Sequence, residues 1–119
     1  MQTILCVDDE QTQLMLLRLA LTRAGYQVLE ALDGQKGIDM AIKHQPALII
    51  MDLMMPVMDG ATAIWQIKQN QKTKDIPILV LSAYTRGDQA QRALEAGAAE
   101  LISKSLILTE LIDKVNSYL

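Results

Sequence analysis

Short, uninterrupted apolar runs recur along this chain, and stretches whose apolar residues have helical spacing lie between them. Residues 3–7 and 47–51 are two such runs. A run of about five apolar residues is typical of a strand buried on both faces, as in a parallel sheet. Because strand-like and helix-like stretches alternate throughout, the pattern predicts an α/β fold of five βα units, with helices covering both faces of the sheet.

Cap and turn residues set the bounds of these units. Gly25 and Gly97 are C-terminal stop signals, and Pro46 ends the second helix. Asp59 is a good N-cap for the third helix, and Thr109 is the expected cap of the fifth. The expected strands are 3–7, 26–31, 47–51, 78–81 and 100–103, and the expected helices end near residues 24, 44, 70, 96 and 118.

Three carboxylates follow two of the apolar runs. Asp8 and Asp9 close the first run, and Asp52 closes the third. If these strands are parallel neighbours, their carboxyl ends meet at the edge where open parallel sheets bind ligands. Like charges held close together raise their pKa values or require a cation, and a hard divalent metal is the simplest one. The sequence therefore predicts an acidic, metal-binding pocket.

Two further polar residues fall on the same edge. Ser82 follows the fourth strand, and Lys104 follows the fifth. A carboxylate can attack a phosphoryl group to form an acyl phosphate. A hydroxyl can donate to one phosphoryl oxygen, an ammonium group can offset the charge of another, and Mg²⁺ can neutralise the rest. Together these groups predict a phosphorylatable aspartate.

Length and charge exclude several classes of protein. The 119 residues, half of them hydrophobic, suffice for a single domain spanning 1–119. The net charge of −3 and the absence of a Lys/Arg cluster argue against direct binding of nucleic acid. Because the chain shows neither an apolar run of about 20 residues nor a basic region at its start, we expect a cytoplasmic protein with no membrane partner. Cys6 lies inside the first run and is interpreted as a buried hydrophobe.

The combined pattern resembles the response regulator receiver domain of two-component signalling, of the chemotaxis-regulator kind. The matching residues are Val7-Asp8-Asp9-Glu10, the run 52–60, Ser82-Ala83 and Lys104. The resemblance covers essentially the whole chain. It implies a flavodoxin-like, doubly wound fold with strand order 2-1-3-4-5, and this topology comes from the resemblance alone.

The resemblance also implies roles for individual residues. Asp52 would be the phosphoacceptor, with Ser82 and Lys104 binding the phosphoryl group. Mg²⁺ would be the cofactor, with these protein ligands: Asp9 directly, Asp8 through water, Asp52, and the backbone carbonyl of Met54. A histidine kinase or histidine phosphotransfer protein would be the donor. Output to a partner protein or domain would use the face of the fourth helix, fifth strand and fifth helix, which is also the candidate homodimer interface.

Two positions depart from the family pattern. Leu101 replaces the aromatic residue that many receivers carry three positions before the lysine, so the usual aromatic switch is missing. Ser105 replaces the proline that usually follows the lysine in a cis peptide, and a cis bond before a non-proline residue would cost ~3 kcal/mol. Neither change touches the phosphorylation chemistry, so we expect phosphate acceptance with a different or weaker route to output. Tyr84 is a candidate either to gate access to Asp52 or to substitute in signalling.

Other readings of the same residues stay open. Asp9 and Ser82 are each suited to capping a following helix, and Asp59 and Gly60 are interpreted as structural residues at a helix start. The run 54–58 is either core or a partly exposed partner surface.

Two other functions compete with the signalling switch. One is a degenerate receiver that acts as a docking or dimerisation module without phosphate. The other is a Mg²⁺-dependent phosphohydrolase with Asp52 as nucleophile, which the lack of an Asp-x-Asp motif, a Walker A run and a long insertion weakens. Whether the domain acts alone or within a longer regulator is left open.

Overall fold

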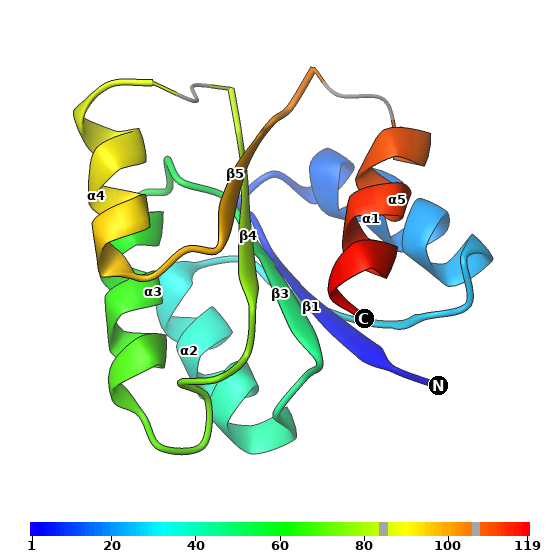
Figure 1. The fold of residues 1–119 in the computed structure, drawn as a ribbon, viewed down its shortest axis with the longest axis horizontal. Helices are drawn as coiled ribbons and strands as arrows, with labels where there is room; N and C mark the ends of the chain where they lie inside the picture. Colours follow the sequence, from blue (N-terminus) through cyan, green and yellow to red (C-terminus); the bar gives the residue numbers. More distant parts are fainter. Residues whose placement is uncertain (84–85, 106–107) are drawn as a thin grey trace.

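The described part of the chain forms one parallel sheet with helices packed on both faces (Figure 1). The computed structural model describes residues 1–83, 86–105 and 108–119. The strand order is β2-β1-β3-β4-β5, which confirms the expected fold class. The strands are β1 (Thr3–Val7), β2 (Gln27–Ala31), β3 (Leu48–Met51), β4 (Ile78–Ser82) and β5 (Glu100–Ser103). The helices are α1 (Gln11–Arg23), α2 (Gly34–His44), α3 (Gly60–Gln69), α4 (Asp88–Ala96) and α5 (Leu108–Tyr118).

The helices divide between the two faces of the sheet. In Figure 1, α2, α3 and α4 cover one face, whereas α1 and α5 cover the other. Alternate residues of β1 enter separate cores: Leu5 and Val7 pack toward α2 and α3, and Ile4 and Cys6 pack toward α1 and α5. Both faces of the central strands are therefore buried, which explains the uninterrupted apolar runs. Burial also raises the pKa of the Cys6 thiol, so this residue is a packed hydrophobe, as expected.

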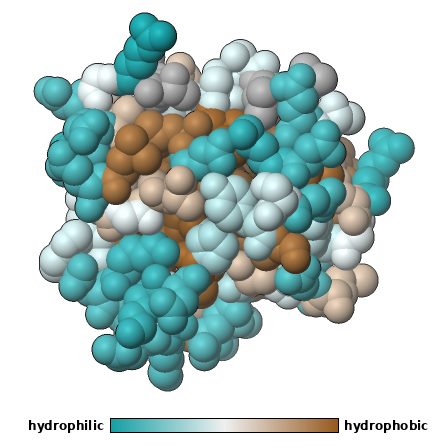
Figure 2. All heavy atoms as spheres, in the orientation of Figure 1, coloured by the Kyte–Doolittle hydropathy of each residue, from teal (hydrophilic) through white to brown (hydrophobic). Residues whose placement is uncertain are grey.

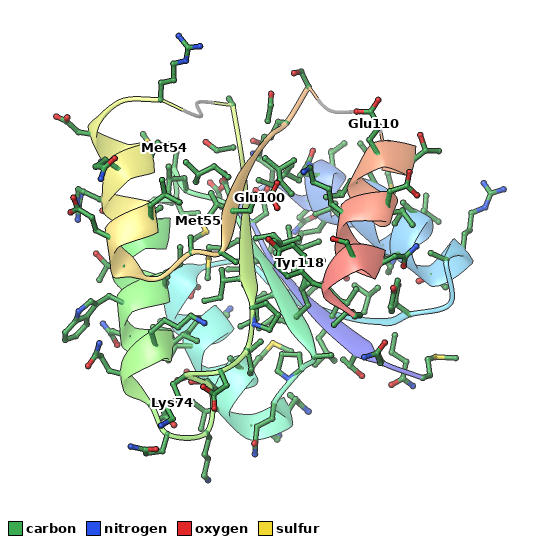
Figure 3. The ribbon with its side chains drawn as sticks, in the orientation of Figure 1. Met54, Met55, Lys74, Glu100, Glu110 and Tyr118 are labelled. Atoms are coloured by element: carbon green, nitrogen blue, oxygen red, sulfur yellow. The ribbon has the colours of Figure 1, made fainter. Side chains whose placement is uncertain are left out.

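The register of the strands brings their carboxyl ends to one level. Val7 of β1 pairs with Met51 of β3, so the residues that follow the two strands are adjacent. Ser82 pairs with Ser103, and the Lys104 N–H donates to the Ser82 carbonyl at 2.8 Å. In Figure 3, the side chains of Met54, after β3, and Lys74, between α3 and β4, lie at opposite ends of the molecule. The candidate site residues thus share one edge of the sheet.

One expected helix cap is wrong, although its helix begins near the expected residue. α5 begins at Leu108, so Thr109 is its second helical residue and lies in the first turn. A cap residue has extended backbone geometry and precedes the first helical residue, which Thr109 does not. By contrast, Asp59 caps α3 as predicted, because its carboxylate accepts from the Thr62 N–H at 2.8 Å. Asp33 caps α2 in the same way, accepting from the Lys36 N–H at 2.8 Å.

Within the described residues, no helix has both the length and the apolar character that crossing a bilayer requires. The longest helix in the described ranges, α1, spans 13 residues.

Gln45, the C-cap of α2, offers a test of helix termination far from the candidate site. Its backbone is left-handed, with φ 46° and ψ 63°, and its side chain is exposed. Because glycine adopts this geometry without a β-carbon penalty, Gln45→Gly is expected to raise the free energy of unfolding by about 0.5–1 kcal/mol. Urea denaturation measures the change. Gln45→Ala keeps the β-carbon and is the matched control, so an equal gain in that variant would contradict the explanation.

Candidate functional site

Three carboxylates converge at the carboxyl ends of β1 and β3. Asp8 and Asp9 follow β1, Asp52 follows β3, and one oxygen of each lies within 4.8 Å of the others. Asp8 and Asp52 are only 3% and 5% exposed, whereas Asp9 faces solvent. The three carboxylates therefore meet at one edge, as predicted, and the structure adds that two of them are buried and one lies at the mouth of the pocket.

Backbone N–H groups orient the two buried carboxylates. Glu10 N–H donates to Asp8 Oδ1, and Leu53 N–H donates to Asp52 Oδ1, both at 2.9 Å. The Lys104 ammonium group lies between them, 3.4 Å from Asp8 Oδ2 and 3.2 Å from Asp52 Oδ1. It bridges the ends of β1, β3 and β5 at the place where the two buried carboxylates face each other.

The pKa values show that the pocket favours positive charge. Burial raises the pKa of Asp8 to about 6, although the Glu10 N–H and Lys104 act in the opposite direction. Burial also raises the pKa of Asp52, again against the effect of Lys104. Partial burial works to lower the pKa of Lys104 itself, but the nearby Asp52 and Asp8 carboxylates outweigh it and raise that pKa. Losing a proton from a carboxylate here is therefore costly unless a cation compensates.

The donor set fits a hard divalent cation. Carboxylate oxygens are the ligands that Mg²⁺ prefers, and three carboxylates within 4.8 Å of one another exceed what one lysine neutralises. Met54 lies two residues after Asp52, in the loop between β3 and α3 (Figure 3).

Ser82 lies at the end of β4, is fully buried and borders Lys104 through the backbone bond already described. The capping alternative does not hold for it or for Asp9. The N-cap of α1 is Glu10 and that of α4 is Gly87, and neither makes a side-chain cap bond. Both Ser82 and Asp9 thus lie at the carboxyl edge of the sheet without capping a helix.

Glu10 belongs to the surroundings of the pocket, although sequence reasoning gave it no role. Its carboxylate lies 3.9 Å from the Lys104 ammonium group and is largely exposed. The sequence could have indicated that Glu10 lies near the pocket, because it is the third acidic residue in the run after β1. Asp59 also does more than cap α3, since its Oδ2 lies 3.4 Å from Arg92 Nη1 and links the β3–α3 loop to α4.

The loop 54–58 divides between core and surface. Met55 is buried in the core beneath α2 and α3, and Met58 packs against the same core. Met54 is half exposed and Val57 fully exposed, with Val57 in the left-handed region at φ 69°.

The two departures from the family pattern have defined environments. Leu101 is partly buried and packs against the core on the α2–α4 side. After β5, Ser105 N–H donates to Ser103 Oγ at 3.2 Å, and the two hydroxyls lie 2.7 Å apart. No cis peptide bond occurs among residues 1–83, 86–105 and 108–119. Tyr84 lies outside the described residues.

The raised pKa of Asp8 predicts how stability depends on pH. Between its usual value of 3.8 and about 6, folded Asp8 holds a proton that the unfolded chain has lost. The free energy of unfolding of the metal-free protein should therefore fall as pH rises across this window, by at most about 1.4 kcal/mol per pH unit for this group. Asp8→Asn should reduce the slope, and Asp39→Asn, on the exposed side of α2, should keep it. Urea unfolding at several pH values measures both, and an unchanged slope in Asp8→Asn would contradict the assignment.

Two solved structures share this architecture over nearly the whole chain. A chemotaxis protein of Vibrio cholerae is 29% identical, with a TM-score of 0.93, and the match covers 100% of this chain and 99% of that one. The receiver domain of a sensor histidine kinase from Pseudomonas aeruginosa, solved with a magnesium ion in its active site cleft, is 26% identical. Its TM-score is 0.92, with 98% of this chain and 96% of that chain covered.

The chain is also similar in sequence to curated proteins and to a family profile. The transcriptional regulator RpaA of Synechocystis is 34% identical over 119 residues, which are 100% of this chain and 49% of RpaA. The polar-differentiation response regulator DivK of Brucella ovis is 25% identical over 118 residues, 99% of this chain and 96% of DivK. The chain thus spans about half the length of RpaA and nearly all of DivK. The profile of the response regulator receiver domain matches residues 4–116. The acidic pocket, the strand order and these matches together show that the chain belongs to the receiver domain family of two-component response regulators.

Proposed function

We propose that this receiver domain is a phosphorylation switch in which Asp52 accepts a phosphoryl group from a phosphohistidine donor in the presence of Mg²⁺. The observation that carries the proposal is the pair of buried carboxylates, Asp8 and Asp52, bridged by Lys104 at the carboxyl edge of the sheet. Such a pair is unfavourable for stability alone, because burial opposes the charged form of both groups.

The transfer itself exchanges one bond to phosphorus for another. A carboxylate oxygen of Asp52 attacks the phosphorus of phosphohistidine, an O–P bond forms, and the P–N bond breaks. The electron pair of that bond stays on the imidazole nitrogen. The donor leaves as neutral histidine, because either its other ring nitrogen already carries a proton or the freed nitrogen takes one from solvent. The Leu53 N–H, which donates to Asp52 Oδ1, keeps the carboxylate oriented during the approach of the donor.

The other pocket residues divide between the metal and the phosphoryl group. Asp8, Asp9, Asp52 and the Met54 carbonyl are the proposed protein ligands of Mg²⁺. When bound, this ion would neutralise charge on the carboxylates and on the phosphoryl oxygens. Lys104 would exchange part of its contact with Asp8 and Asp52 for a phosphoryl oxygen, and the Ser82 hydroxyl would donate to another.

Output is proposed to follow from this exchange of partners. An acyl phosphate adds charge comparable to the −1.5 to −2 of a phosphorylated hydroxyl, that is, roughly two units at one end of β4 and β5. Drawing Ser82 and Lys104 inward would bias the surface formed by α4, β5 and α5 between two states. Figure 2 shows this face, with hydrophobic side chains gathered between α4 and α5 and hydrophilic ones around them.

A charged cluster lies on the same face and ties β5 to α5. Glu100 of β5 accepts from Lys114 Nζ at 2.5 Å and from the Tyr118 hydroxyl at 2.9 Å. Glu100 and Tyr118 are labelled in Figure 3. The Lys114 bond is the main reason why the pKa of Glu100 lies below its usual value. A shift of β5 would therefore be transmitted to α5 without the aromatic residue that Leu101 replaces.

Receiver domains are signalling modules rather than classical enzymes, and the partners proposed here follow from that class. The donor is a histidine kinase or a histidine phosphotransfer protein, and the output is a downstream protein or domain. We also propose that residues 1–119 form one receiver domain, that it works in the cytoplasm, and that the α4–β5–α5 face is its homodimer surface.

Loss of the phosphoacceptor provides the direct test. After incubation with Mg²⁺ and acetyl phosphate, intact mass should show a single phosphoryl adduct on the wild type and none on Asp52→Asn. Asp33→Asn is the matched control, because asparagine is as good a helix cap as aspartate and Asp33 caps α2 outside the cluster of Asp8, Asp9 and Asp52. The control should keep the adduct.

Other results would favour the rival functions. Wild-type protein with neither an adduct nor Mg²⁺ binding would contradict the switch and favour a docking module. Steady release of phosphate from small esters, lost in Asp52→Asn, would favour a phosphohydrolase. An adduct that Asp52→Asn retains would place the phosphoacceptor elsewhere.

A further inference from the structure

We infer that Gly60 is a positioning residue for the phosphoacceptor: its missing β-carbon makes room for the backbone of Asp52 and Leu53. This inference rests on the proposed function, because it assigns Gly60 an effect on Mg²⁺ binding and on phosphoryl transfer at Asp52. Gly60 itself touches the backbone beside the site and no reacting group.

The space around Gly60 is limited by backbone atoms. A β-carbon at Gly60 would lie 2.4 Å from the Asp52 carbonyl oxygen, 2.9 Å from Leu53 Cα and 3.2 Å from the Asp52 carbonyl carbon. Backbone atoms cannot rotate away as the end of a flexible side chain can. A side chain at this position would therefore push the Asp52–Leu53 peptide out of place.

That peptide determines the geometry of the pocket. Its N–H, from Leu53, donates to Asp52 Oδ1 and orients the carboxylate. Met54 follows directly, so its carbonyl, a proposed metal ligand, moves with the same segment. The Gly60 N–H donates to the Leu53 carbonyl at 2.9 Å and closes the loop between β3 and α3.

Because Asp59 caps α3 through the Thr62 N–H, the first turn of the helix cannot easily move away in compensation. The end of β3 and the start of α3 are thus fixed against each other at the phosphoacceptor.

A second Asp-Gly helix start in the same chain shows that the sequence pattern alone does not create this constraint. Gly34 follows the N-cap Asp33 at the start of α2, as Gly60 follows Asp59 at the start of α3. A β-carbon at Gly34 would lie 3.2 Å from Cβ, Cγ and the carbonyl oxygen of Met58, a distance that needs a shift of only a few tenths of an ångström, against the 2.4 Å contact at Gly60. Both glycines follow an aspartate N-cap, but Gly60 faces the backbone of Asp52 and Leu53, whereas Gly34 faces Met58.

The test compares Mg²⁺ affinity in the full chain, measured by titration calorimetry, for wild type and Gly60→Ala. We expect Gly60→Ala to lower the affinity by about tenfold, the lower end of the loss that follows when the support of a metal ligand is disturbed. Adduct formation with acetyl phosphate should slow in the same variant. Gly34→Ala, the control of matched sequence, should leave both unchanged.

Loss of stability alone requires a separate control. Gly97 follows α4 with φ 121°, and a β-carbon there would meet Lys68 Cγ at 2.8 Å. Gly97 lies two residues before Ala99, whose N–H donates to the carbonyl of Ile78 at the start of β4. Gly97 is therefore near the start of β4, whereas Ser82 is at its other end. Gly97→Ala should therefore lower the melting temperature while Mg²⁺ affinity stays unchanged.

Each outcome either supports or contradicts the inference. If Gly60→Ala does not fold, it is repeated in the Gln45→Gly background, and failure to fold there too would make Gly60 a folding residue and overturn the positioning role. Unchanged Mg²⁺ affinity in folded Gly60→Ala, or an equal loss in Gly97→Ala, would also overturn it. If wild type itself neither binds Mg²⁺ nor accepts phosphate, the proposed function fails, and the glycine inference fails with it.

Discussion

The structure of this site depends on two carboxylates buried side by side at the ends of neighbouring parallel strands. Asp8 and Asp52 are brought together by the in-register pairing of β1 with β3 and oriented by the N–H groups of Glu10 and Leu53. Burial raises the pKa of both groups, and Lys104 acts in the opposite direction by contact with each. A fold selected only for stability would replace such a cluster with apolar packing.

This arrangement makes the pocket responsive to any change in positive or negative charge. A divalent cation and the Lys104 ammonium group would compete for the same carboxylate oxygens. A phosphoryl group would add negative charge, which both cations could offset. Lys104 follows β5, and its N–H donates to the Ser82 carbonyl of β4. If the Lys104 ammonium group changed its partner in the pocket, the ends of β4 and β5 would therefore be affected as well. From there, the contacts of Glu100 with α5 provide a physical route to the surface, in a chain where Leu101 is only partly buried.

Much of this could be predicted from the sequence, because the signals concerned are local. Continuous apolar runs indicated strands buried on both faces, and polar residues directly after them indicated the site edge, so Asp8, Asp52 and Lys104 were found without coordinates. Contacts between distant segments could not be predicted. Asp33-Gly34 and Asp59-Gly60 look alike in sequence, and only the fold shows that Gly60 abuts the backbone of Asp52, the proposed phosphoacceptor. Thr109 was expected to cap α5 on residue type alone, which does not fix where a helix begins.

Metal binding is expected to relieve the unfavourable charge of the buried carboxylates Asp8 and Asp52. The most direct measurement is the free energy of unfolding as a function of Mg²⁺ concentration at about pH 7.5 and about pH 5, below the raised pKa of Asp8. The account predicts that stability rises with Mg²⁺ at the higher pH, and that the gain is much smaller at the lower pH, where Asp8 is protonated. No gain at the higher pH, or the same gain at both, would contradict it.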